Sequence, residues 1–137
     1  MAGNIHLEIV TPESSVVSED AQIVVSPGSL GDFGVLIGHT PFLTTLRVGS
    51  VRYVDSDGKE RSVFVSGGFA EALPDKVTIL AEAAERRRDI DLERAQTAFE
   101  RAQKRIEEKG MDDINYARAK AALTRALYRL NVVKDKI

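Results

Sequence analysis

The sequence predicts two modules: an all-β sandwich or barrel over residues 1–84, followed by an antiparallel two-helix hairpin over residues 85–137. Three observations predict this organisation. All four prolines and nine of the ten glycines lie before residue 75, where they can end strands and form turns. Short runs of alternating apolar residues fill the same region. Beyond Ala81 the apolar residues recur every three or four positions, which is the period of a helix.

The β module is expected to consist of short strands joined by turns. The strongest turn signal is Asp57-Gly58, which divides residues 51–65 into two β-rich runs, because glycine tolerates the positive φ of a tight hairpin. Many short strands with turn residues between them are typical of a sandwich or barrel. The other candidate strands are residues 5–10, 21–25, 33–37, 42–48 and 76–83.

Two helices are expected after the β module, each with a narrow apolar stripe in which large residues alternate with alanine. Gly110 is expected to end the first helix and Asp112 or Asp113 to cap the second, so a short link makes the helices antiparallel. Such a hairpin buries little surface, so we expect it to rest on the β module or on a partner and to be able to leave. The stripe residues are Leu92, Ala95, Phe99, Ala102 and Ile106, then Tyr116, Ala119, Leu123, Ala126, Leu130 and Val133.

Composition excludes several kinds of site. The chain has no cysteine and two histidines, so we expect no disulfide, no thiolate zinc site and no histidine-rich metal site. No apolar run approaches the about 20 residues of a membrane-spanning helix. The N-terminal residues lack the pattern of a signal peptide. The chain is therefore expected to stay where it is made, without inserting directly into a membrane.

Charge is distributed unevenly between the two modules. Residues 1–86 carry a net charge of −6 and residues 87–137 a net charge of +4, which favours different partners for the two parts. Three consecutive arginines, residues 86–88, precede the first helix. A helix N-terminus already has positive character, so these arginines are expected to need a negative partner, supplied in part by Asp89 and Asp91.

The two helices repeat one arrangement of arginines. In the first helix, glutamates one turn away can pair with them. The second helix has five basic and no acidic residues from Ile114 to Lys134, so it is expected to seek nucleic acid, a nucleotide phosphate or an acidic partner subunit. Nucleic acid is the least favoured, because the front module is acidic and no aromatic residues alternate with the basic ones. The repeated residues are Arg94, Arg101 and Arg105, then Arg118, Arg125 and Arg129.

The sequence offers no catalytic constellation. Gly28, Gly31 and Gly34 are spaced like a nucleotide-binding loop, but no Gly-Lys-Ser/Thr and no helix follow them. His39 lies in the following loop without an evident orienting carboxylate or nucleophile, so we expect a contact or turn residue rather than a catalytic base. The chain is therefore not expected to be an enzyme.

Five segments in order resemble the epsilon subunit of the F-type ATP synthase, and together they cover nearly the whole chain. They read "IHLEIVTPE", "GDFGVLIGHTPFLTTLRVG", "VFVSGGFAEALPDKVTILAEAAE", "DIDLERA" and "INYARAKAALTRALYRL". The resemblance implies a non-catalytic subunit of the rotating central stalk. Its β-sandwich would pack on the gamma subunit and on the membrane rotor ring, with His39 as a candidate contact to the ring. It would lie peripherally on the inner, cytoplasmic face of a bacterial membrane, or on the equivalent plastid membrane.

The same resemblance implies that the helical hairpin is mobile. Folded against the β module it would permit turnover, and extended into the alpha/beta catalytic head it would block ATP hydrolysis. Some family members bind regulatory ATP through an Ile/Leu-Asp-x-x-Arg-Ala motif, present here from Ile90 to Ala95. No cofactor is required, and no metal is expected. The implied ATP-binding residues are Glu85, Ile90, Asp91, Arg94, Ala95, Arg101, Arg118, Arg125 and Arg129.

Two alternatives remain open on the sequence. Asp91 can simply cap the first helix. The chain can also be a free-standing adenine-nucleotide sensor outside any larger machine. Fork-shaped guanidinium groups suit phosphate oxygens, so an Arg125→Ala variant is expected to bind ATP more weakly in either case.

Overall fold

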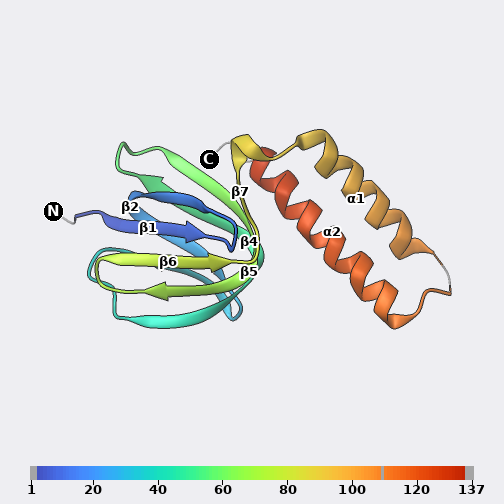
Figure 1. Cartoon of the computed structure of the whole chain (residues 1–137), viewed down its shortest axis with the longest axis horizontal. Helices are drawn as coiled ribbons and strands as arrows, with labels where there is room; N and C mark the ends of the chain where they lie inside the picture. Colours follow the sequence, from blue (N-terminus) through green and yellow to red (C-terminus); the bar gives the residue numbers. More distant parts are fainter. Residues whose placement is uncertain (1–2, 109, 135–137) are drawn as a thin grey trace.

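The computed structural model describes residues 3–108 and 110–134, and it confirms the predicted fold class: a β module followed by two helices (Figure 1). The strands are β1 (Ile5–Val10), β2 (Ser15–Gly28), β3 (Gly31–Val35), β4 (Phe42–Asp55), β5 (Glu60–Ala72), β6 (Lys76–Ala81) and β7 (Ala84–Arg86). A short 3-10 helix, η1 (Arg87–Asp89), leads to α1 (Leu92–Glu107) and α2 (Asp113–Lys134).

Hydrogen bonding closes the β module into a flattened barrel. Its strand order is β1-β6-β5-β4-β2-β3, and β1 also pairs antiparallel with β2, so five strands form a ring. All pairings are antiparallel except β1 with β6. Closure leaves few unpaired strand edges, and the alternating residues of each strand fill the interior.

The barrel interior holds the main hydrophobic core. Ile5, Leu7 and Ile9 of β1 are completely buried, as the alternation of that segment predicts. They pack with buried valines of β2, β4, β5 and β6 and with the ring of Tyr53. The β module therefore has a core that does not include the helices.

Two strands are longer than any single predicted run. β2 and β4 have 14 residues each. The run predicted within β2 is residues 21–25, whereas β4 joins the predicted run 42–48 to the first half of the predicted hairpin, which begins at residue 51. Irregular pairing explains the difference for β2, because its register with β4 shifts between Val25 and Gly28. Pro27 lies at this irregularity, where a residue without a backbone N–H is tolerated.

The predicted turn at Asp57-Gly58 is confirmed. Gly58 has φ +84°, and the backbone N–H groups of Asp57 and Lys59 donate to Asp55 Oδ1 at 3.0 and 2.9 Å. Arg61 Nε donates to the second carboxylate oxygen at 3.0 Å. The Lys59 N–H is the main cause that lowers the pKa of Asp55, with the Arg61 and Asp57 donors adding to it. A single carboxylate thus organises the β4–β5 turn.

The apolar stripes of the two helices are confirmed at their centres. Ala95 and Ala102 of α1 and Ala119 and Ala126 of α2 are buried between the helices. The prediction is wrong for the first residue of each stripe. Leu92 and Tyr116 lie in the first turns of their helices and are about half exposed, at 46% and 45%. At the end of α2, Val133 is partly buried, as predicted, and its neighbour Val132 is almost completely buried, because the last turns of this helix pack against the β module.

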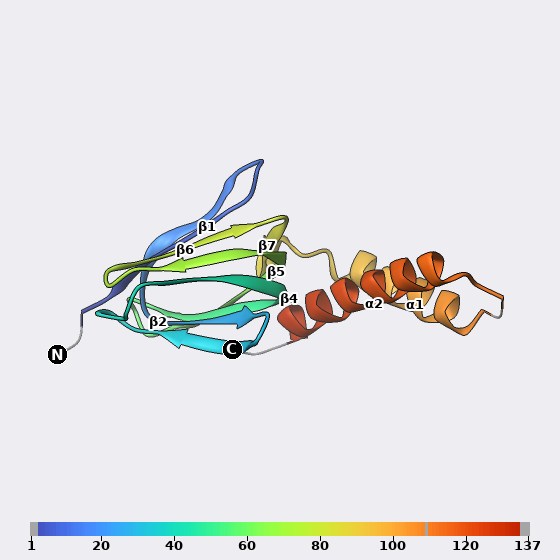
Figure 2. The ribbon, with the colours of Figure 1, turned by 90° about the horizontal axis from the view of Figure 1, so that it is seen from below.

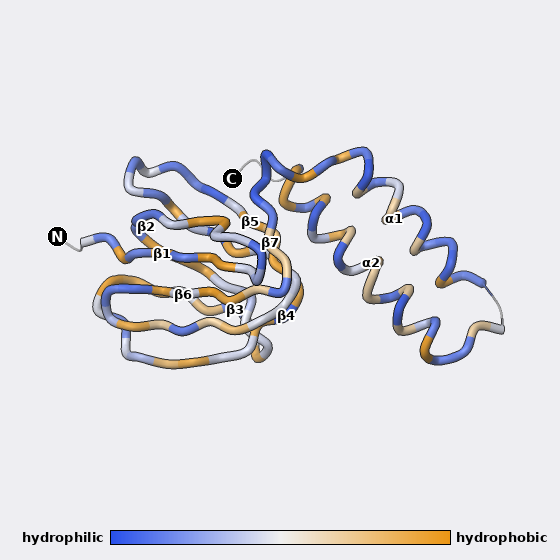
Figure 3. The backbone as a smooth tube through the Cα atoms, viewed as in Figure 1, coloured by the Kyte–Doolittle hydropathy of each residue, from blue (hydrophilic) through white to orange (hydrophobic). Residues whose placement is uncertain are grey.

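Among the described residues, the helical hairpin contacts the β module at its root (Figures 1 and 2). α2 runs back along α1 and brings its C-terminal turns to β4 and β5, while the far end of the hairpin projects away from the barrel. A second core cluster forms at this junction from Phe64 of β5, Ile90 of the linker, and Ala95, Leu130 and Val132 of the helices. Along the projecting part, α1 is mostly hydrophilic (Figure 3).

The connection between the modules is a strand rather than a loop. β7 spans Ala84–Arg86 and pairs antiparallel with Val63–Val65 of β5. Glu85 and Arg86, which sequence analysis assigned to the hairpin side of a boundary at residue 84, are therefore part of the sheet. Successive residues of a strand point to opposite faces, so this short strand directs its side chains to two sides of the junction.

Candidate functional site

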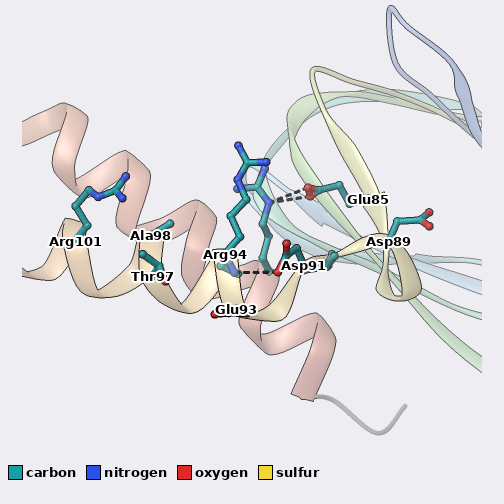
Figure 4. Close-up of a pocket in the computed structure, with 11 residues that line it drawn as sticks. Glu85, Asp89, Asp91, Glu93, Arg94, Thr97, Ala98 and Arg101 are labelled. Atoms are coloured by element: carbon teal, nitrogen blue, oxygen red, sulfur yellow. Dashed lines mark hydrogen bonds and ion pairs between the residues drawn. The ribbon is translucent and has the colours of Figure 1, made fainter.

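A cavity of about 670 Å³ lies at the root of the helical hairpin, between β7, the linker and both helices (Figure 4). A volume of this size is typical of small-molecule sites. Its walls include seven of the nine residues that the resemblance implied for ATP. The lining residues are Glu85, Asp89, Ile90, Asp91, Glu93, Arg94, Ala95, Thr97, Ala98, Arg101 and Arg129.

An ion pair between the modules forms one wall of this cavity. Arg129 Nε of α2 donates to the two carboxylate oxygens of Glu85 at 3.1 and 2.9 Å. The Arg129 guanidinium also lies over the ring of Phe64, with its Cζ 4.5 Å from the ring centroid, a favourable cation–π arrangement. Both charged side chains are about one third exposed. Arg129 is thus held by two residues of the sheet.

The Ile-Asp-x-x-Arg-Ala segment forms the entry to α1, and three of its residues have structural roles there. Asp91 Oδ1 accepts a hydrogen bond from the Arg94 backbone N–H at 3.0 Å, which makes Asp91 the N-cap of the helix. Ile90 is buried against Phe64 and Leu130 in the junction core. Ala95 is 4% exposed and lets α1 and α2 approach each other closely. The capping alternative for Asp91 is therefore correct as a structural role.

The charged side chains around α1 divide into two groups. Arg94 and Arg101 are seven residues apart and project to the same side of the helix, whereas Glu93 points to the other side (Figure 4). Glu85 faces the helices, and Asp89 points away from α1 (Figure 4). Three guanidinium groups and four carboxylates line the cavity. Of the carboxylates, that of Glu85 is paired with Arg129 and that of Asp91 caps α1.

Two of the implied ATP-binding residues lie elsewhere. Arg118 lines a neighbouring cavity of about 280 Å³, which it shares with Arg101 and Arg105. Arg125 is half-buried on α2 and belongs to the lining of neither cavity. The arginine pattern of α2 therefore contributes to the first cavity only through Arg129, so Arg94 and Arg129 are sharper tests of that cavity than Arg125.

The internal partner of Arg129 is not evident from the sequence. The lack of acidic residues on α2 predicts an external anion, but Glu85 of β7 pairs with Arg129. Charge patterning along one helix cannot find such a pair, because its members are 44 residues apart. Asp89, Glu93, Thr97 and Ala98 of the lining were also missed, although all four lie within a turn or two of the motif.

His39 lies in the loop between β3 and β4, far from this cavity in the sequence. Its Nδ1 is 2.6 Å from the Thr40 carbonyl oxygen, and its ring is tilted against Phe42 with centroids 5.0 Å apart. The backbone hydrogen bond between the His39 N–H and Leu36 closes the same loop. The histidine is a turn residue in the isolated chain, and its contact with the rotor ring stays a prediction.

Two family models match the chain end to end. Residues 4–87 match the ATP synthase delta/epsilon chain β-sandwich domain. Residues 88–134 match the ATP synthase delta/epsilon chain long α-helix domain. The match therefore includes both modules and the junction between them.

Curated relatives agree with the family models over the full length. The ATP synthase epsilon chain of Desulforapulum autotrophicum is 60% identical over 136 residues, which are 99% of this chain and 100% of the relative. The chain belongs to the ATP synthase epsilon chain family. The epsilon chain of Nitratidesulfovibrio vulgaris is 51% identical over 132 residues, covering 96% and 97% of the two chains. Full-length membership in this family favours a synthase subunit over the free-standing nucleotide sensor.

Solved structures show the same fold at lower identity. A chain of the Euglena gracilis mitochondrial ATP synthase superposes with a TM-score of 0.77 at 24% identity, over 88% of this chain and 76% of that chain. A chain of the Tetrahymena thermophila mitochondrial ATP synthase central stalk and c-ring gives 0.61 at 11% identity, over 97% and 98%. Within residues 3–108 and 110–134, neither helix combines the length and apolar character needed to cross a membrane.

Proposed function

We propose that this epsilon-family chain is a non-catalytic part of the rotating central stalk, positioned by its β module and regulatory through its helical hairpin. The β module would bind the gamma subunit and the membrane rotor ring on the cytoplasmic face of a bacterial membrane. The hairpin would permit ATP hydrolysis when docked and inhibit it when extended into the alpha/beta catalytic head. Membership in the family supports assembly of the chain into the synthase, and the two-module architecture supports movement of the hairpin relative to the β module.

An exposed apolar patch on the β module supports the binding of a partner. Leu43, Phe69 and Leu80 are 70%, 52% and 54% exposed. Phe69 lies directly opposite Leu80 in the β5–β6 register, and opposite Thr45, two residues from Leu43, in the β4–β5 register. Contiguous apolar side chains on a sheet face are typical of a protein interface. We infer that this face of the barrel is covered in the assembled stalk.

The limited docking surface supports a hairpin that can move. The hairpin meets the β module through the last turns of α2, with Leu130 and Val132 against Phe64 and with the Glu85–Arg129 ion pair beside them. Because the barrel keeps its own core when these contacts break, detachment does not require unfolding of the β module. A docked state held by so few contacts can be shifted by a ligand.

The cavity at the hairpin root supports ATP as that ligand. Its walls come from β7, the linker, α1 and α2, so it is complete only when the hairpin is docked, and this observation carries the proposal. Arg94, Arg101 and Arg129 would bind the phosphates, because guanidinium groups form strong charge-assisted hydrogen bonds with phosphate oxygens. A ligand that binds only the docked state stabilises that state by a free energy that grows with the logarithm of the ratio of ligand concentration to Kd.

Calorimetric titration of the full chain with ATP tests this proposal. We expect Arg94→Gln to weaken ATP binding at least tenfold. Lys104→Gln is a matched control, because it removes one exposed positive charge from α1 without touching the cavity. Equal loss in both variants would mean that net charge, and not the cavity, determines binding.

Reconstitution tests the role of the hairpin. We expect the full chain to lower the hydrolysis rate of an epsilon-depleted synthase, and a chain ending after residue 88 to bind the gamma subunit without lowering that rate. The β module is suited to this experiment because its core is separate from the helices. Failure of the full chain to bind the gamma subunit would contradict the assignment to the stalk.

A further inference from the structure

The three consecutive arginines before α1 border a second cavity, on the opposite face of the junction from the site described above. Glu85 and Arg86 are adjacent on β7 and therefore point to opposite faces. Glu85 lines the first cavity, and Arg86 lines one of about 470 Å³. The lining of this second cavity is Tyr53, Glu60, Arg61, Ser62, Val63, Arg86, Arg87, Arg88 and Val133.

Four of these nine lining residues are arginines and one is acidic. Three of the arginines are held by hydrogen bonds to the fold, one of them being Arg61, whose Nε donates to Asp55. Arg86 Nε donates to the Val16 carbonyl oxygen at 2.9 Å, and Arg87 Nη2 donates to the Val133 carbonyl oxygen of α2 at 2.9 Å. Each guanidinium has five N–H donors, so Arg86 keeps further donors beyond the one that holds it in place.

Of the nearby carboxylates, Glu19 lies behind the cavity against Tyr53, with which it shares a hydrogen bond, and two others are engaged elsewhere. Asp55 accepts from two backbone N–H groups and from Arg61. Glu85 is on the other face with Arg129. Within residues 3–108 and 110–134, the exposed Arg88 side chain makes no hydrogen bond or ion pair. The lining acid Glu60 is exposed, at the rim of the β4–β5 turn.

The side chains that line the inner wall of the cavity are uncharged, and the Glu19 carboxylate lies behind Tyr53. Burial, and a hydrogen bond with Glu19, raise the pKa of Tyr53, so its phenol keeps its proton and adds no negative charge. Val63 and Val133 contribute apolar surface from β5 and α2. The cavity therefore has an uncharged floor and a rim on which four arginines outnumber the lining acid Glu60 and the underlying Glu19, which suits an oxyanion bound by guanidinium groups.

We propose that this cavity binds a phosphate group between Arg61, Arg86 and Arg88, and that the bound phosphate holds the helical hairpin in its docked position. The phosphate is either inorganic phosphate or the phosphate of a small metabolite. The link to the hairpin is direct, because Arg87 holds the end of α2 through Val133 and both residues line the cavity. The site is separate from the proposed ATP cavity and does not depend on it.

Titration calorimetry of the full chain with inorganic phosphate, at constant ionic strength, tests the site. We expect Arg88→Gln to weaken phosphate binding about tenfold, the loss of one charge-assisted hydrogen bond. Lys104→Gln, which removes an exposed charge far from the junction, should bind phosphate like the wild type. Arg94→Gln should also keep phosphate binding while losing ATP, which separates this proposal from the previous one.

Titration of the Arg94→Gln variant with ATP distinguishes the two sources of phosphate. If this variant still binds ATP and the further substitution Arg88→Gln abolishes that binding, the cavity accepts the phosphate of a metabolite. If the variant binds inorganic phosphate but not ATP, the ligand is the free ion. The proposal is overturned if the wild type binds neither, or if Arg88→Gln binds phosphate as tightly as the wild type. Loss of phosphate binding in Arg94→Gln would also overturn it, because the ion would then occupy the other cavity.

Hydrogen exchange tests the effect on the hairpin. We expect phosphate to slow amide exchange in residues 128–134 of the wild type and to have no effect on those amides in Arg88→Gln. Phosphate that binds without slowing this exchange would contradict the holding role.

Discussion

Leu130→Ala should detach the helical hairpin while leaving the barrel folded. Leu130 is 4% exposed and packs with Phe64, Ile90 and Val132 in the small core of the junction. Truncating a buried leucine to alanine costs about 3 kcal/mol. At 1.4 kcal/mol for each factor of ten, the ratio of docked to undocked molecules should fall about 100-fold.

Amide hydrogen exchange can measure the effect of Leu130→Ala on the helices and on the barrel separately. A two-helix hairpin without a third surface is only marginally stable, so undocking should also unfold the helices transiently. We expect the protection of α1 and α2 amides to fall about 100-fold in Leu130→Ala. Amides in the paired regions of β4 and β5 should keep wild-type protection, because the barrel core is separate.

Leu127→Ala is the matched control, since it makes the same truncation one turn earlier on α2 at a residue that is 41% exposed. We expect it to change helix protection by less than about 0.5 kcal/mol. Two results would refute the reasoning. Unchanged protection of α2 in Leu130→Ala would mean that the junction core does not hold the hairpin. Equal loss of protection in the strands and the helices would mean that the modules unfold together.

Three further predictions concern particular contacts. In a double-mutant cycle, Glu85→Gln and Arg129→Gln are made singly and together, and the free energy of hairpin docking is measured for each. We expect the two substitutions to be coupled by about 1 kcal/mol, because the ion pair is only partly buried. Additive effects would show that the ion pair does not contribute to docking. The lowered pKa of Asp55 means that its charged form stabilises the fold above about pH 4, and that this contribution is lost as pH falls through the lowered pKa. Asp55→Asn should therefore be less stable at pH 7 and lose less stability on acidification, as followed by urea unfolding, and a parallel pH dependence in both proteins would contradict this. Gly68→Ala should destabilise the barrel by about 3 kcal/mol, since Gly68 has φ +129° and an added Cβ would collide with the backbone of β6. If the variant has the same thermal unfolding midpoint as the wild type, this position does not require glycine.

The division into two modules could be predicted because different physical rules govern each part. Prolines and glycines are confined to the strand region, and alanines recur at the helix interface, so the local pattern and the final packing agree. Ala95, Ala102, Ala119 and Ala126 are buried as their spacing predicts. The length of β2 could not be predicted, because this strand continues through irregular pairing that its partner strand determines.

Most residues of the candidate site could be predicted, but the contacts between them could not. The resemblance selected both Glu85 and Arg129, but nothing local indicates that they pair, because one lies in the sheet and the other on α2. The arginines of α2 have the same spacing as those of α1, yet Arg129 alone of its helix reaches the first cavity. Which arginine reaches it depends on how the helix docks, and this is a property of the junction core.

The central claim is that the hairpin works by changing its position relative to the barrel. The chain has no cysteine, so one spin label can be placed at Ser56 in the exposed β4–β5 turn and another at the exposed Glu108 near the far end of the hairpin. Pulsed electron paramagnetic resonance on the chain assembled into an epsilon-depleted synthase then measures the distance between them. We predict two distance populations without ATP and a shift to the docked population when ATP is added. A single distribution that is the same with and without ATP would contradict the account.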